Sequence, residues 1–253
     1  MVVEHLRVPG FVDLRHLSFG PEGSVVVREA DLSRALMLGT DVSRITFQAV
    51  DWPDCSVAGS TRRVVADELH WPPPDSPGLV FGNLEYGPST RGMLEVLYRQ
   101  LKNNYDQQAD YETAGHFHIG EFEAKRLKLK RWTLNRCLVS GYRWVSLYGE
   151  RWARPLIILL VWLVFFAIAE LFAGVSLSSH RIAYSLTGAG GLGSFWHDLG
   201  VTFLHGVQVA TAFRTPDIGY GSIYTLAIVT ARHIIGPALI ALFLLGLRRQ
   251  LKR

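Results

Sequence analysis

The stretch RPLIILLVWLVFFAIAELFAGV, residues 154–175, decides the class of this 253-residue chain. Its apolar run is long enough to cross a hydrocarbon core of roughly 30 Å as a single helix. A second such run, SIYTLAIVTARHIIGPALIALFLLGL, occupies residues 222–247. The two runs predict two transmembrane helices in the C-terminal part of the chain.

Basic residues are concentrated at the outer ends of these two runs. KRLKLKR (125–131) precedes the first run, and RRQLKR (248–253) follows the second. The positive-inside rule therefore predicts that both termini lie in the cytoplasm. A pI near 9.2 also suits nucleic acid, but basic residues beside membrane spans favour anionic lipid headgroups. We expect the lipid bilayer as a partner and no nucleic acid.

Each apolar run carries one internal charge. Glu170 lies 15 residues from Pro155 (170 − 155), and Arg232 lies 15 residues from Leu247 (247 − 232). At 1.5 Å per residue, both charges lie roughly 22 Å from the cytoplasmic ends of their helices. An unpaired charge at such a depth costs about 3 kcal/mol. We predict that the two form an intramembrane ion pair; the alternative is that either lines an ion path.

Two further features mark the membrane module. Gly236–Pro237 predicts a kink in the second span, because proline breaks a helical hydrogen bond. Between the spans, SFWHDLGVTFLHGVQVATAF (194–213) is apolar and helical. A third complete span there would place the C-terminus outside, against the charge distribution. We therefore expect a re-entrant or surface-lying helix within a re-entrant segment, 194–221, with His205 and Gln208 as candidate site residues.

Span, re-entrant helix, loop and span follow one another as in the pore module of potassium channels. TPDIGYGS (215–222) resembles the filter signature T-x-G-Y-G-D of that family, although Asp217 and Ser222 depart from it. In such channels stacked backbone carbonyls replace the water shell of the ion. Because two spans cannot enclose a pore, the resemblance implies a homo-oligomer. It implies candidate pore or filter residues at Thr215, Asp217, Gly219, Tyr220 and Gly221.

Residues 25–52 repeat every five residues, as VVVRE, ADLSR, ALMLG, TDVSR, ITFQA and VDW. The third position of each unit is a large apolar residue and the first is a smaller one. This period is neither the 3.6 of a helix nor the 2 of a strand; the alternative is short strands with accidental spacing. ADLSR fits the A(D/N)LXX consensus, and the segment resembles the pentapeptide-repeat family. The resemblance implies a short right-handed quadrilateral β-helix that needs covering at its ends.

The segment 87–131 predicts two helices that form a hairpin, separated at NNYDQQAD (103–110). It is similar to the juxtamembrane hairpin that links pentapeptide repeats to membrane modules in bacterial proteins. This resemblance implies that the membrane is a bacterial inner (plasma) membrane. Trp144, Tyr148 and Trp152 follow it and predict an interfacial aromatic belt before the first span.

The expected fold class is a multidomain membrane protein: a short β-helix, a helical hairpin, then two transmembrane helices with a re-entrant helix between them. The expected function is a homo-oligomeric membrane channel or pore-like protein with a cytoplasmic pentapeptide-repeat regulatory part. The alternative is a membrane-anchored interaction scaffold that does not conduct and binds a cytoplasmic protein or ligand. No catalytic, cofactor or metal site is expected. The predicted parts are 1–53 (β-helix), 54–87 (linker), 88–153 (hairpin and approach helix) and 154–253 (membrane module).

Overall fold

The computed structural model describes residues 2–4, 12–17, 23–57, 60–69, 88–173, 175–177, 180–182, 192–211, 218–220 and 223–251. Within these residues the chain is mostly helical, with seven α-helices and only small sheets. It divides into two compact units, an N-terminal unit (Met1–Glu150) and a C-terminal unit (Arg151–Leu251). Each unit is described by itself.

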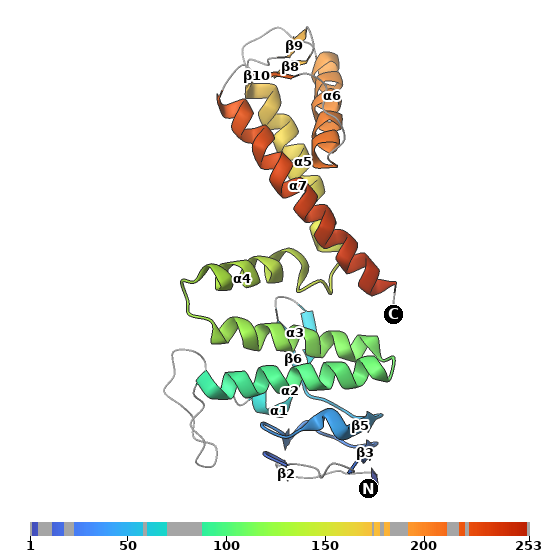
Figure 1. The fold of residues 1–253 in the computed structure, drawn as a ribbon. Helices are drawn as coiled ribbons and strands as arrows, with labels where there is room; N and C mark the ends of the chain where they lie inside the picture. Colours follow the sequence, from blue (N-terminus) through green and yellow to red (C-terminus); the bar gives the residue numbers. More distant parts are fainter. Residues whose placement is uncertain are drawn as a thin grey trace. The chain divides into compact units, whose positions relative to one another are not determined.

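The N-terminal unit combines short strands with a helical hairpin (Figure 1). Its helices are α1 (Ala66–Leu69), α2 (Pro88–Gln107), α3 (Tyr111–Lys128) and α4 (Leu134–Ser146), with a 3-10 helix at Val42–Arg44. Its strands are β1 (Val2–Glu4), β2 (Val12–Asp13), β3 (Val25–Arg28), β4 (Ala35–Leu36), β5 (Ile45–Gln48), β6 (Asp54–Val57) and β7 (Ser60–Arg63). Strands β1, β3 and β5 form a parallel sheet in the order β1-β3-β5. Strands β2 and β4 pair in parallel, and β6 and β7 form an antiparallel hairpin.

The prediction of a quadrilateral β-helix is wrong. Of the strands in residues 25–52, β3 and β5 share one small sheet and β4 pairs with β2 in another, and no β-helix forms in the described part of the chain. Most apolar residues of the five-residue period are buried, among them Met37, Phe47 and Trp52. However, they pack against α2 and α3 and not inside stacked coils. So short a segment cannot enclose a core by itself, and the helical hairpin closes it.

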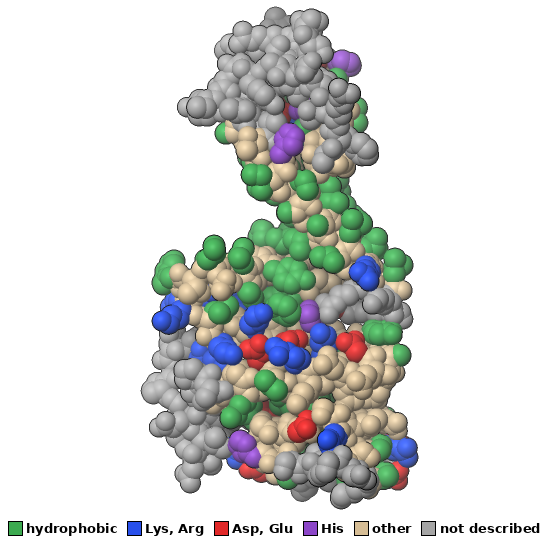
Figure 2. Space-filling model, in the orientation of Figure 1, with side chains coloured by type: hydrophobic (Ala, Val, Ile, Leu, Met, Phe, Trp, Pro, Cys, Tyr) green, Lys and Arg blue, Asp and Glu red, His purple; other side chains and the backbone are tan. Residues whose placement is uncertain are grey.

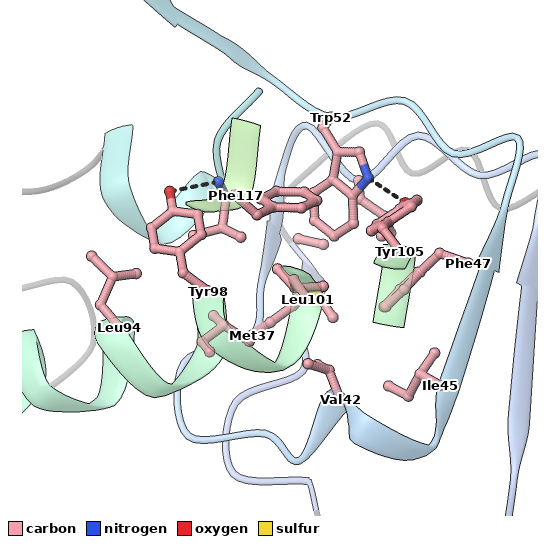
Figure 3. Packing of buried hydrophobic residues seen from close by; sticks show 14 of the residues in the cluster. Met37, Val42, Ile45, Phe47, Trp52, Leu94, Tyr98, Leu101, Tyr105 and Phe117 are labelled. Carbon is pink, nitrogen blue, oxygen red and sulfur yellow. Dashed lines mark hydrogen bonds between the residues drawn. The ribbon is translucent and has the colours of Figure 1, made fainter. Parts of the chain in front are cut away.

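Aromatic side chains from strands and helices meet in this core (Figure 3). Trp52 lies edge-on to Phe117 of α3, with 5.1 Å between ring centres. The indole Nε1 of Trp52 donates a hydrogen bond of 2.8 Å to the hydroxyl of Tyr105 on α2. Phe47 of β5 stacks on the same tyrosine with ring centres 6.3 Å apart. These contacts join both helices to the strands.

The break between the two hairpin helices is shorter than the sequence predicts. Helix α2 continues to Gln107, and α3 begins at Tyr111 after Asp110, whose carboxylate accepts from the Thr113 amide at 3.1 Å. Asn104 donates from its side chain to the carbonyls of Val42 and Ile45. These bonds keep the end of α2 on the strands, where the sequence alone indicated a loop.

Part of the predicted linker, 54–87, belongs to the folded unit. Its first residues form β6, β7 and α1, and Val65 is completely buried; residues 70–87 lie outside the described residues. The hydroxyl of Tyr98 on α2 donates to Glu68 and accepts from the Val65 amide at 3.2 Å. Arg62 pairs with the same carboxylate. Burial, followed by the charge of Glu68, raises the pKa of Tyr98 well above its usual value.

Helix α4 packs on α3 through one face. Val139 and Tyr142 pack on a small cluster that includes Tyr148, and the Tyr148 hydroxyl donates to Glu123 at 3.0 Å. Tyr148 is completely buried, so it cannot belong to the interfacial aromatic belt that the sequence predicted. Trp144 on α4 is 75% exposed.

In its described residues, the C-terminal unit contains three helices that pack on one another and a small sheet (Figure 1). The helices are α5 (Ala153–Ala173), α6 (Leu192–Ala210) and α7 (Ile223–Gln250), and the strands are β8 (Val175–Leu177), β9 (His180–Ile182) and β10 (Ile218–Tyr220) in the order β10-β8-β9. Two segments, Ala153–Phe172 and Thr230–Arg248, are long and apolar enough to cross a membrane. Helix α7 continues through Gly236 and Pro237 without ending.

Candidate functional site

One face of α5 points into the three-helix bundle and carries the only acidic residue of that helix. Leu159, Leu163, Ala167 and Leu171 recur every four residues and are buried. This spacing places them on one side of the helix. Glu170 lies three residues after Ala167, so its carboxylate projects from the same side and is completely buried.

The structure brings Glu170 and Arg232 together. Arg232 Nη1 on α7 donates to Glu170 Oε1 at 2.6 Å, and both side chains are 0% exposed. Arg232 Nη2 makes a longer contact of 3.4 Å with the Leu163 carbonyl, and the guanidinium carbon lies 5.8 Å from the centre of the Phe166 ring. Arg232 is thus held by three groups on one face of α5. Such pairing offsets part of the desolvation cost of both charges and fixes the register of the two helices.

Helix α6 covers the ion pair through a glycine. A side-chain carbon at Gly206 would lie 3.0 Å from the guanidinium of Arg232, closer than ordinary packing allows. At Gly236 of α7, it would lie 2.8 Å from Ala210 of α6. Helix α6 continues through Gly206 without interruption. Gly206 and Ala210 are spaced as a small-xxx-small motif, which is the signal that identifies this helix contact from sequence.

His205 adds an unsatisfied polar side chain to the same region. It is 3% exposed, and neither of its ring nitrogens has a hydrogen-bond partner among the described residues. The same holds for Glu170 Oε2 and Arg232 Nε, and His205 lies within electrostatic range of Arg232. Buried polar groups in folded proteins are usually satisfied, by water where no protein group is available. Ordered water is the usual partner for such buried polar atoms.

Gln208, the second candidate on α6, lies about 60° around the helix from His205 and is exposed. It belongs to an outward stripe whose members are three or four residues apart: His197, Gly200, Leu204, Gln208 and Thr211. The structure therefore separates the two candidates. His205 is buried within electrostatic range of Arg232, and Gln208 is exposed at the helix surface.

The candidate filter is only partly described. Gly219 and Tyr220 lie in β10 and pair with Ser176 and Val175 of β8. Because β10 is an edge strand, these pairings use one of its two edges. Thr215, Asp217 and Gly221 lie outside the described residues. The filter and the kink at Gly236–Pro237 stay predictions.

No group of three or more His, Cys, Asp or Glu side chains suited to hold a metal ion occurs in the part of the chain that the structure describes. Comparisons with protein families, curated proteins and solved structures give no match to this chain. Its function is therefore argued from the geometry of the C-terminal unit.

Proposed function

We propose that the protein is a homo-oligomeric channel or pore-like protein of a bacterial inner membrane. Its C-terminal unit crosses the bilayer twice, through α5 and α7, with both termini in the cytoplasm. The N-terminal unit serves as the cytoplasmic regulatory part. The length and apolar character of the two helices support the spans, and the basic flanks support the orientation.

The main support for this proposal is that the outward faces of α5 and α6 differ in the polarity of their side chains. The exposed large residues of α5 are all apolar, as a lipid-facing surface requires: Ile157, Leu160, Val161, Val164, Phe165, Ile168 and Phe172. The outward stripe of α6 includes His197, Gln208 and Thr211. Polar side chains at membrane depth face protein or a water-filled cavity, since exposure to lipid is costly. We infer that α6 of several copies surrounds a common axis.

The ion pair and the filter have separate roles in this proposal. Glu170 and Arg232 hold α5 and α7 at a fixed height, so that α6 has a rigid support. His205 lies behind the outward stripe and binds water or an ion that enters the bundle. The segment that contains Gly219 and Tyr220 supplies backbone carbonyls at the mouth of the pore.

The test is current through the purified, reconstituted protein. In a Cys55→Ser/Cys137→Ser background, Gln208→Cys should pass current that a charged thiol reagent blocks. Leu160→Cys, on the apolar outward face of α5, is the matched control and should conduct without being blocked. Silence of both variants and of the wild-type protein across voltages would contradict conduction, and equal block of both would contradict the assignment of α6 to the pore.

A second candidate function, a membrane-anchored scaffold without conduction, is favoured by one feature of the N-terminal unit. A cavity of ≈ 350 Å³ lies between the 3-10 helix region and α2, lined in part by Asp41, Met93 and Val96. Met93 and Val96 are partly exposed, so a cytoplasmic protein or ligand has apolar surface to contact. A protein that is monomeric in detergent and silent in bilayers would favour this alternative.

A further inference from the structure

Helix α4 of the N-terminal unit turns an apolar stripe outward. Leu134 is 75% exposed, Leu138 63% and Trp144 75%, and Cys137 and Gly141 between them are exposed as well. These residues are spaced three, one, three and three apart, so they lie along one side of the helix. Trp132, just before the helix, is 92% exposed. Figure 2 shows these hydrophobic side chains gathered over α4.

The opposite face of α4 is fixed by contacts, so the outward stripe is not the result of a loosely placed helix. Val139 and Tyr142 pack inward. Arg143 Nε lies 2.6 Å from a carboxylate oxygen of Glu123 on α3. Thr133 caps the N-terminus of the helix, and Leu147 ends it in a left-handed conformation with φ 49°. The rotation of the helix about its own axis is thereby set.

The charges around the stripe suit an anionic surface. Residues 129–149 contain four basic residues and no acidic residue. Arg143 pairs with Glu123 of α3, and the other three are Lys130, Arg131 and Arg136. A helix with Leu and Trp on one side and basic residues around it has the composition of helices that lie in a membrane interface. Basic side chains there gain attraction from anionic lipid headgroups.

The chain itself keeps α4 close to the first candidate span. Seven residue steps separate Ser146, the last residue of α4, from Ala153, the first of α5 (153 − 146). Fully extended, these steps cover at most about 25 Å. The C-terminal end of α4 is therefore tethered within this distance of the point where α5 enters the bilayer.

We propose that α4 lies in the plane of the cytoplasmic membrane interface, with its outward stripe inserted among anionic lipids. The lipid acyl chains just below the headgroups then contact the apolar outward stripe of α4. The inference rests on α5 being a membrane span, as in the proposed function, and not on conduction.

The test uses Cys137, which lies within the stripe. The full-length Cys55→Ser protein, labelled at Cys137 with bimane, is reconstituted into vesicles of phosphatidylcholine and phosphatidylglycerol. Lipids with a nitroxide on the upper acyl chain should reduce the emission about twofold. The control is Val96→Cys in the Cys55→Ser/Cys137→Ser background. It places the label on an exposed site of α2 outside the stripe and should keep its emission.

Three results would overturn the proposal. Quenching at Cys137 by a water-soluble nitroxide alone would place the stripe in water. Protection from both quenchers would indicate a second copy or another protein on it. Quenching of the same size in vesicles of pure phosphatidylcholine would contradict a role for anionic lipids. If the span itself is wrong, the protein will not stay with the vesicles after an alkaline wash, which separates that failure from a failure of α4.

Discussion

The two units of this chain differ in the side chains that they expose. In the N-terminal unit, Phe117 and its aromatic neighbours fill the core, while Arg99 is half exposed and bonded to Glu95 and Glu121 on the surface. In the C-terminal unit, large apolar residues of α5 face outward and the Glu170–Arg232 pair is completely buried. On the face shown in Figure 2, blue and red side chains gather over α2 and α3, and hydrophobic ones follow α5 and α7. The difference indicates water around the first unit and lipid around the second.

Replacing a phenylalanine in each unit should give the largest contrast. Phe117→Ala should lower the free energy of unfolding of the N-terminal unit by about 4 kcal/mol, because it leaves a cavity among packed rings. Phe165→Ala should cost about 1 kcal/mol or less, because Phe165 is 63% exposed on α5. Chemical unfolding of the detergent-solubilised protein measures both. Similar losses would mean that α5 is packed on all sides.

Breaking an ion pair in each unit sharpens the same contrast. Arg232→Met should destabilise the C-terminal unit by about 3 kcal/mol, because it leaves the Glu170 carboxylate buried without its partner. Arg99→Met should cost about 1 kcal/mol or less, since Arg99 is half exposed.

The double variant Glu170→Leu/Arg232→Met separates pairing from packing. It should recover most of the loss caused by Arg232→Met, as both charges are then absent. The readout is the thermal midpoint of helix loss in detergent. A double variant as unstable as the sum of its two single variants would show that the charges do not act as a pair.

Two glycines offer a smaller contrast. Gly206→Ala should destabilise the helix bundle by about 2 kcal/mol, because its side chain meets the Arg232 guanidinium at 3.0 Å. Gly141→Ala on α4 has nothing within 4 Å and should stabilise its helix by about 0.5–1 kcal/mol. Both are measured by thermal unfolding. Equal effects would contradict the close approach of α6 to Arg232.

Alkaline pH should affect the N-terminal unit through Tyr98. Below about pH 10 the hydroxyl is neutral in both folded and unfolded chains. Above it, the unfolded chain ionises while the raised pKa keeps the folded hydroxyl neutral, so stability falls as pH rises. Tyr98→Phe should cost about 1 kcal/mol at neutral pH and make the alkaline loss smaller. Unfolding free energies on both sides of about pH 10 test this; an unchanged alkaline loss would contradict it.

The regular geometry of helices explains what the sequence could predict. Glu170 and Arg232 are equally far from the inner ends of their apolar runs, and a constant rise per residue turns equal counts into equal depths. The five-residue spacing of 25–52 gives no such constraint, because it does not say what closes the core. Trp52 meets Phe117 from a helix more than 60 residues away (117 − 52), a contact that no local period encodes.

The candidate site was likewise only partly predictable from the sequence. The spacing of Gly206 and Ala210 is visible in the sequence. The residues that contact these two are not, because they depend on which face of α6 meets α7. The stripe of α4 is likewise a visible helical period. Only the contacts of Val139 and Tyr142 show that the stripe faces away from the core.

Labelling from each side of the membrane tests most directly whether the C-terminal unit crosses the bilayer twice. Single cysteines at Met93, Arg181 and Arg248, in a Cys55→Ser/Cys137→Ser background, are exposed to an impermeant maleimide in right-side-out and inverted vesicles. We predict that Met93→Cys and Arg248→Cys react only in inverted vesicles and that Arg181→Cys reacts only in right-side-out vesicles. Reaction of Met93→Cys and Arg248→Cys from opposite sides, or of all three from one side, would contradict the account.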